Sequence, residues 1–421
     1  MSTTTALQFY QLSRYGSFLL ISVLLVKFGL PQDVIGKYET FLFIAGIVSF
    51  FWIGGLLNTS LSIYPEKEDK GKFLFNLIFS LSFINGLACS AVFFYFHFSG
   101  DFFPYINILI PYIFLNNLSF LVEYVYLMKK NSTRLFIYSI LIHSALLFLV
   151  CLCLFTVAGD LRVLFWSLVI YAALKCSWLL LQVWPLMRFQ LDLKEISYLW
   201  KYATPLILSM LLAGSGEYID GLIIKYYFND SAFAIFRYGA KELPLVLLVA
   251  NSFSTSTIPK VAENLEHSLP YIKRNSYLLI HLLFPISIIL IACSDWLYVF
   301  VFDDEFLQSA SLFRIYILLV IFRLMFPQTI LIGLKKTKVL MSISAIEILL
   351  NVSLSLYFVQ FWGLRGIAIA TVIAYFADKV ISAGYVYFTL NINPRKYIPM
   401  KTLSFYTFIL LLSYYLVVQF V

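Results

Sequence analysis

The chain has 421 residues, of which 61% are hydrophobic and only 12% are charged, and its mean hydropathy is +0.88. A soluble protein carries about 25% charged residues, so this composition excludes a water-soluble enzyme of ordinary make-up. The formal net charge of +8 comes from lysines and arginines that are scattered over short loops, which argues against a nucleic-acid partner.

Apolar segments follow one another along the whole chain, and most are long enough to cross a bilayer as a helix. Continuous apolar runs, rather than alternation with a period of two residues, favour helices over the strands of a barrel. The predicted limits are 15–30, 40–64, 73–96, 105–128, 135–157, 163–184, 199–224, 233–258, 276–302, 312–334, 339–362, 366–390 and 402–421. The first segment is short and is expected to extend back to about Leu7. The predicted fold class is therefore all-α, a polytopic transmembrane protein with about 13 (12–14) helices.

Lysines and arginines concentrate in alternate loops, which orients the chain because cytoplasmic loops carry the excess of positive charge. The loops that would face the cytoplasm hold Lys67, Lys70, Lys72, Lys129, Lys130, Arg134, Arg188, Lys194, Lys260, Lys273, Arg274, Lys335, Lys336, Lys338, Arg395, Lys396 and Lys401, and Arg14 precedes the first segment. The opposite loops hold Lys37, Arg162, Lys225 and Arg365. We therefore expect a cytoplasmic N-terminus.

Similar stretches recur in the two halves of the chain. Tyr15–Leu20 (YGSFLL) and Tyr202–Ile207 (YATPLI) each open a segment, and Ser62–Pro65 (SIYP) and Ser256–Pro259 (STIP) each close one. Six segments separate the equivalents, so both halves have the same orientation, as in transporters built from parallel repeats. The expected domains are an N-terminal six-helix bundle over 1–197, a C-terminal six-helix bundle over 198–390 and an additional helix over 391–421.

Charged residues inside the apolar segments are costly and each needs a reason. Segments 7 and 8 form a predicted hairpin about Asn229, which brings Asp220 to the depth of Arg237 and Glu217 to the depth of Lys241. Residues three or four positions apart share a helix face, so the two pairs can meet. They would either neutralise one another or form a gate or cation site.

Other intramembrane charges have less evident partners. Arg323 and Glu347 lie at matched depth across the next hairpin, and structural pairing is the simpler explanation. Asp378 and Lys379 are adjacent on one helix, so their side chains should point about 100° apart and pair poorly. Lys175 has no charged partner nearby in the sequence, and its segment corresponds to that of Lys379 in the repeat.

Two cations near segment ends and two histidines are further ionisable residues of the apolar segments. Lys27 and Arg314 lie near the outer boundary, where their side chains could extend to water. His143 and His281 have no ligand partner at helical spacing, so hydrogen-bonded or packed histidines are expected and no metal site is predicted.

Several motifs resemble those of the Wzx-type polysaccharide flippases, which share a superfamily with multidrug exporters and peptidoglycan-precursor flippases. The motifs are Gly36–Tyr38 (GKY), Tyr218–Asp220 (YID), Phe236–Ala240 (FRYGA), Asn351–Leu354 (NVSL) and Gly363–Thr371 (GLRGIAIAT). The last is the most specific, since a glycine turn leads there into a helix with a small-residue face that permits close packing. With the segment plan, the resemblance spans nearly the whole chain.

The resemblance implies two six-helix bundles around a central cavity in the bacterial cytoplasmic membrane. It implies transfer of an undecaprenyl-pyrophosphate-linked oligosaccharide, for O-antigen or capsule synthesis, and it leaves open contacts with membrane lipid and other polysaccharide-assembly proteins. Such a substrate needs cations, because arginine and lysine bind phosphate. The candidate substrate-binding residues are Lys27, Lys175, Arg237 and Lys241, and the candidates for gating or ion coupling are Glu217, Asp220, Arg323 and Glu347. No cofactor is expected, and coupling to protons or sodium ions stays open.

Three alternatives remain. A multidrug or cation exporter of the same superfamily would favour an anionic cavity, whereas the intramembrane charges without near partners here are mainly positive. A membrane enzyme of polysaccharide assembly needs an acid–base cluster, and the sequence shows no nucleophile–base arrangement. A receptor or structural membrane protein would not explain the internal repeat and the buried charges.

Overall fold

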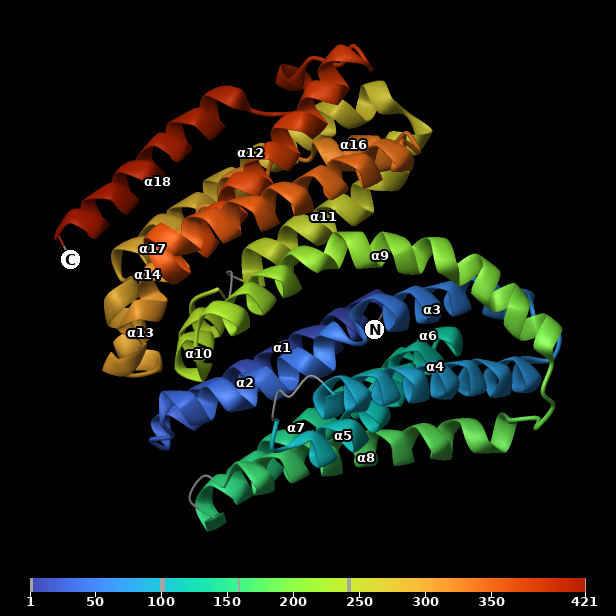
Figure 1. Ribbon diagram of the computed structural model, residues 1–421. Coiled ribbons are helices and arrows are strands. Elements are labelled where there is room, and N and C mark those ends of the chain that lie inside the picture. Colours follow the sequence, from blue (N-terminus) through green and yellow to red (C-terminus); the bar gives the residue numbers. More distant parts are fainter. Residues whose placement is uncertain (1–2, 99–102, 158–159, 241–243, 421) are drawn as a thin grey trace. The chain divides into compact units, whose positions relative to one another are not determined.

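The computed structural model describes residues 3–98, 103–157, 160–240 and 244–420, and these segments are almost entirely helical (Figure 1). Within them there is no β-strand. Nine described helices are long and apolar enough to cross a membrane, or up to eleven if each of two bent helix pairs is one span. The all-α, polytopic fold class is therefore confirmed, and this number of spans is broadly consistent with the predicted segments.

The chain groups into two compact units, Met1–Gly214 (unit 1) and Ser215–Val421 (unit 2). The boundary lies inside one long helix, because the chain passes from one unit to the next without a loop. The division into 1–197, 198–390 and 391–421 stays a prediction, and the last helix of the chain packs inside unit 2.

Unit 1 is a bundle of long helices and two broken spans. Its elements are α1 (Thr3–Lys27), α2 (Gln32–Ile47), α3 (Phe50–Ile63), η1 (Tyr64–Glu66), α4 (Lys70–Phe98), α5 (Ile106–Ser119), α6 (Leu121–Met128), α7 (Ser132–Val157), α8 (Leu161–Val183), η2 (Trp184–Leu186) and the first part of α9 (Leu193–Tyr227). Helix α1 packs along α7, and α5 packs against both α4 and α8. Stacked rings fill the core, with Phe41 and Phe165 centroids 4.1 Å apart and both side chains fully buried.

Unit 2 holds the remaining helices. They are the rest of α9, α10 (Asp230–Gly239), α11 (Pro244–Glu263), α12 (Leu265–Ala292), α13 (Ser294–Val301), η3 (Asp304–Phe306), α14 (Leu307–Ile317), α15 (Val320–Arg323), α16 (Pro327–Gly333), α17 (Thr337–Phe388), η4 (Pro394–Lys396) and α18 (Met400–Phe420). Helix α12 packs along α18, and α16 packs against α11 and α17. The predicted turn at Asn229 is present, since the Asn229 side chain accepts a hydrogen bond from the Ala232 backbone N–H at 2.9 Å and caps α10.

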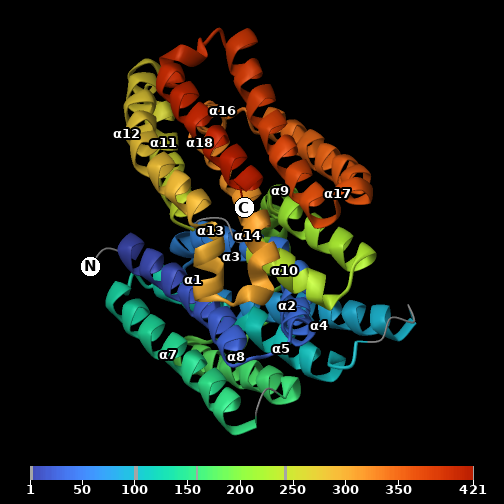
Figure 2. The same ribbon diagram turned by 90° about the vertical axis from the view of Figure 1, so that its left-hand side faces the viewer.

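Helix α17 is 52 residues long but reverses direction at Gly363, so it contains two of the predicted segments (Figure 2). Gly363 has φ 56° and ψ −132°, a conformation that favours glycine. The Asn351 side chain donates a hydrogen bond to Thr371 Oγ1 at 3.1 Å, although residues so far apart would be separated by about 30 Å in a straight helix. The halves before and after Gly363 are therefore antiparallel.

Several sequence-based boundaries differ from the structure, as when α12 begins at Leu265 instead of at residue 276. Helix α1 begins at Thr3, close to the expected extension of the first segment to about Leu7. Arg14 therefore lies inside the first span rather than in a cytoplasmic stretch before it. Helix α11 continues through Pro259 to Glu263, so this proline does not end the segment.

Candidate functional site

Lys175 lies on α8, buried in unit 1 with 2% of its surface exposed. Its Nζ is 3.5 Å from Asn116 Oδ1 on α5 and 5.0 Å from the centre of the Phe120 ring. The carboxylate of Glu123 on α6 is buried too, and the charges of Lys175 and Arg14 act on it. Lys175 is therefore not isolated, because the fold supplies partners that are distant in the sequence.

The break between α5 and α6 organises this unit 1 cluster, defined as Arg14, Glu123 and Lys175. Phe120 occupies the break, and its ring also receives the Arg14 guanidinium at 5.5 Å from the centroid. Two cations thus lie within cation–π distance of one aromatic ring. One carboxylate for two cations leaves surplus positive charge, and Glu123 Oε2 has no hydrogen-bond partner in the part of the chain that the structure describes.

Lys379 occupies a corresponding place in unit 2, with 4% of its surface exposed. Its Nζ donates to Gln328 Oε1 at 2.6 Å and forms an ion pair with Asp378 Oδ2 at 3.1 Å. Gln328 in turn donates from Nε2 to Asp378 Oδ2 at 2.7 Å. The expectation that Asp378 and Lys379 pair poorly is wrong, because the long lysine side chain bends back toward its neighbour and both bind the same amide.

Arg323 and Glu347 belong to the same neighbourhood. Arg323 Nη1 donates to the hydroxyl of Tyr375 at 3.3 Å. The charges of Asp378, Lys379 and Arg323 all act on Glu347. We call Arg323, Glu347, Asp378 and Lys379 the unit 2 cluster. It has as many carboxylates as cations, and direct pairing of Arg323 with Glu347 stays a prediction.

Lys175 and Lys379 have the same kinds of neighbours. Tyr171 precedes Lys175 by one helical turn, and Tyr375 precedes Lys379 in the same way, with each ammonium over its tyrosine ring at 5.2 Å and 4.6 Å. Each lysine also meets a side-chain amide, Asn116 or Gln328, on a helix that is broken close by. In unit 2 the break is at Phe326, which has a left-handed φ of 56°. Interrupted helices beside buried charges are typical of transporter binding sites.

Asp220 is a second buried carboxylate of unit 2. Its Oδ2 accepts hydrogen bonds from Thr371 Oγ1 at 2.7 Å and from the Tyr316 hydroxyl at 3.2 Å. Asn351 binds the same threonine across the α17 hairpin. Carboxylate and hydroxyl oxygens are ligands that hard cations bind, and a carboxylate can equally take a proton. The expected pair of Asp220 and Arg237 stays a prediction, and Arg237 lies half-buried on α10.

The other sequence-based candidates are dispersed. Lys27 is exposed at the end of α1, and Lys241 and the side chain of Glu217 lie outside the described residues. Arg314 is buried instead of extending to water, because its Nη1 pairs with Asp295 Oδ2 at 2.7 Å.

The histidines have hydrogen-bond partners. His143 is buried with Nδ1 2.7 Å from the Ser139 carbonyl oxygen, and His281 Nδ1 is 2.9 Å from the Tyr406 hydroxyl. No His, Cys, Asp and Glu group able to hold a metal occurs in the described segments.

The sequence reasoning missed Glu123, Asn116 and Gln328, which complete the two lysine sites. The neutral amides of Asn116 and Gln328 carry no charge that would mark them in an apolar segment. Glu123 lies near the end of its apolar segment, where a charged residue is common. The shared spacing of Tyr171 with Lys175 and Tyr375 with Lys379 is the pattern that could have identified the sites.

Comparisons with known proteins agree with this fold. The family model for "Polysaccharide biosynthesis protein" matches residues 43–311. No curated protein matches the sequence significantly. The solved structure of the lipid II flippase MurJ in an inward closed conformation has 17% identity and a TM-score of 0.74, covering 98% of this chain and 93% of that chain.

Two transporter structures are also similar. The Vibrio cholerae MATE transporter VcmN in the bent form has 15% identity and a TM-score of 0.58, with 97% of each chain covered. A MOP superfamily transporter from Pyrococcus furiosus has 14% identity and a TM-score of 0.57, with 92% of this chain and 94% of that chain covered. At these identities the likeness concerns the fold.

Proposed function

Since this chain belongs to the polysaccharide biosynthesis protein family, we propose that it flips undecaprenyl-pyrophosphate-linked oligosaccharides across the bacterial cytoplasmic membrane for O-antigen or capsule synthesis. The fold shared with a lipid II flippase supports a lipid-linked substrate. The multi-pass helical fold, which lies in the membrane, supports transport rather than enzymatic conversion.

The observation that carries the proposal is the surplus positive charge of the unit 1 cluster. The charges of the half-buried Arg14 and the buried Lys175 both act on one buried carboxylate, Glu123, and an uncompensated cation inside the membrane is costly. A pyrophosphate would supply the missing negative charge, with arginine offering bidentate contact and lysine a point charge. Glu123 holds the two cations while no substrate is bound.

The proposed mechanism is alternating access between the two halves of the chain around a central cavity. The lipid tail stays in the bilayer, so the protein carries only the charged headgroup across the hydrocarbon. The charges of segments 7 and 8, with Glu217, Asp220, Arg237 and Lys241, form part of the outer gate in this proposal.

Ion coupling is the remaining part of the mechanism. Asp220 is our candidate for it, since its carboxylate is buried among the hydroxyls of Thr371 and Tyr316. A proton or a sodium ion bound there would compete with these hydrogen bonds and loosen the contact between α9 and α17. Arg323 and Glu347 stay candidates for the same role.

A multidrug or cation exporter is the second candidate function. The likeness to MATE transporters and the buried Asp220 carboxylate favour it. An exporter of cations would depend on Asp220 and not on Lys175, whereas the flippase depends on Lys175.

Flipping of a fluorescent undecaprenyl-pyrophosphate oligosaccharide in proteoliposomes tests the proposal. We expect Lys175→Ala to slow flipping at least about tenfold, because a hydrogen bond to a charged group contributes about 1.5 kcal/mol or more. Lys175→Arg should retain part of the activity, and Lys336→Ala, at an exposed lysine of the same charge, should match the wild type.

Wild-type flipping by Lys175→Ala, at equal amounts of reconstituted protein, would contradict the cationic substrate site. If Asp220→Asn alone abolished transport and a cationic dye were transported instead, the exporter would be the better assignment.

A further inference from the structure

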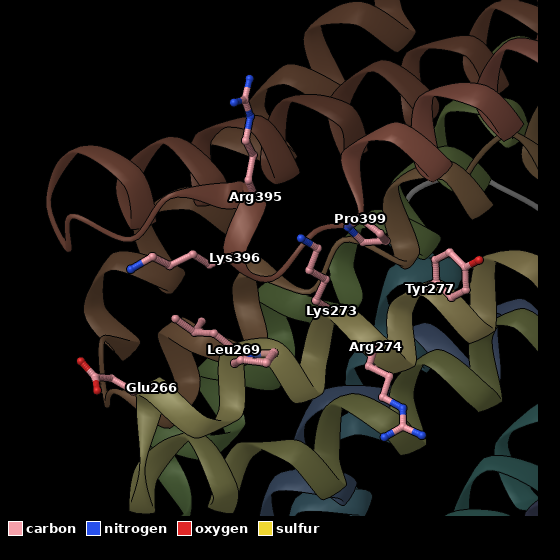
Figure 3. A pocket seen from close by; sticks show the side chains of 9 residues that line it. Glu266, Leu269, Lys273, Arg274, Tyr277, Arg395, Lys396 and Pro399 are labelled. Atoms are coloured by element: carbon pink, nitrogen blue, oxygen red, sulfur yellow. The ribbon is translucent and has the colours of Figure 1, made fainter.

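A cavity of about 690 Å³ lies in unit 2 between α12 and the segment that joins η4 to α18. Four cations line it, Lys273 and Arg274 from α12 and Arg395 and Lys396 from η4, and Glu266 is the one acidic residue among the described residues of its lining. In Figure 3, Lys273 extends from α12 toward the start of α18, whereas Arg274 and Arg395 point away from each other. The cavity does not include any residue of the unit 2 cluster.

The four cations lack carboxylate partners. None of them forms an ion pair within the segments that the structure describes, and all four are exposed. Comparable loop cations of unit 1 do have carboxylate partners. The ion pairs are Lys67 with Glu195 at 3.2 Å, Lys72 with Asp192 at 2.7 Å and Arg188 with Asp69 at 2.8 Å. Four cations that line one concavity without such partners favour an anionic ligand, with Lys273 already extending toward the start of α18.

The cavity lies near the N-terminal end of α12 and directly before the span of α18. With 28 residues, α12 is about 42 Å long, which exceeds the roughly 30 Å of hydrocarbon by about eight residues. If its first two turns lie outside the hydrocarbon, Lys273 and Arg274 mark the boundary. Arg395 and Lys396 directly precede the span of α18, so they lie at the same level.

Beyond the cations, the wall becomes apolar. Tyr277 packs edge-on against His281, which binds the hydroxyl of Tyr406 on α18. Exposed apolar side chains continue along both helices, with Leu278 and Leu282 on α12 and Phe405 and Phe408 on α18. Figure 2 shows α12 and α18 side by side, and they are in contact. A ligand with a phosphate and an acyl chain would match both parts of this surface.

We propose that the cavity between α12 and η4 binds the phosphate of an anionic lipid headgroup, with the acyl chains lying along the exposed apolar side chains of α12 and α18. Basic pockets between membrane helices bind anionic headgroups elsewhere by the same chemistry. Lys273 and Lys396 neutralise the phosphate, and the two arginines rotate inward to complete its hydrogen bonds. The binding is independent of the flippase assignment, since it needs no transport.

Native mass spectrometry of the full-length protein in non-ionic detergent tests this site, with phosphatidylglycerol as the probe and phosphatidylcholine as the zwitterionic comparison. Each lysine at a membrane surface contributes about fivefold to the affinity for an anionic lipid. The double variant Lys273→Gln/Lys396→Gln should therefore weaken binding of the first phosphatidylglycerol molecule about 30-fold. Lys336→Gln/Lys338→Gln removes the same charge from exposed positions outside the cavity and should bind like the wild type.

The outcomes separate the sources of phosphate. Equal weakening by both double variants would show diffuse attraction and overturn the site, as would equally tight binding of phosphatidylcholine. Competition by inorganic phosphate at comparable concentration would assign the cavity to a free anion and overturn the lipid. If the Lys273 variant unfolds in detergent, Lys396→Gln alone, outside the spans, should still weaken phosphatidylglycerol about fivefold.

Discussion

At the scale of single residues, the charges of the unit 1 cluster act on one another across three helices. Glu123 is buried, and the charges of Arg14 and Lys175 both act on it, so each charge is compensated only while the others remain. Removing one charge leaves its partners uncompensated, and this lowers the free energy of unfolding by more than the interaction itself contributes. Energetic coupling between these positions is therefore expected.

A double-mutant cycle of Glu123→Gln and Lys175→Met measures that coupling. We expect each single variant to lower thermal stability in detergent, and the double variant to recover about 1 kcal/mol relative to the sum of the single effects. Glu123→Gln combined with Lys130→Met, an exposed lysine of the same unit, is the control and should be additive. Additive effects in the first cycle as well would refute the proposed contact of Glu123 with Lys175.

At the scale of elements, the interruptions of helices place the polar groups. The break at Phe120 sets Asn116 and Glu123 on two short helices beside α8. The break at Phe326 does the same for Gln328, and the carbonyl of Leu324 that it frees accepts a hydrogen bond from Ser276 at 2.6 Å. The reversal at Gly363 brings Thr371 to Asn351 and Asp220.

Substitution of the hinge glycine tests the role of the reversal. Gly363→Ala should destabilise the protein by roughly 1–3 kcal/mol, since an L-residue is strained at its φ and ψ. Gly384→Ala is a matched control in the same helix, because a Cβ there meets nothing within 4 Å, and its thermal unfolding midpoint should equal or exceed that of the wild type. An unchanged midpoint for Gly363→Ala would mean that the reversal tolerates a side chain.

At the scale of the whole molecule, the basic residues in alternate loops predict one orientation of the chain in the membrane. The basic loop before α7 and the acidic turn at η3 should then face opposite sides, since the positive loops stay in the cytoplasm.

Single-cysteine labelling on a cysteine-free background checks this topology. Thr133→Cys, exposed at the start of α7, should resist a membrane-impermeant maleimide in intact cells and react after permeabilisation. Asp304→Cys, exposed in η3, should react in intact cells. The reverse pattern would invert the predicted orientation.

The sequence by itself determined the fold class, the approximate positions of the spans, the turn at Asn229 and the reversal near Gly363, because the length of an apolar run and the conformational freedom of glycine are local properties. It also marked Lys175 and Asp220 as buried charges that need partners.

Only the tertiary structure decided which partners they have. Asn116 meets Lys175, and Tyr316 and Thr371 meet Asp220, through contacts between helices that are distant along the chain. The charge of Glu123, also distant in the sequence, acts on Lys175. Periodicity within one helix carries no information on the rotation and register of its neighbours. The pairing of Asp378 with Lys379 depended likewise on Gln328, which an adjacent broken helix presents to both.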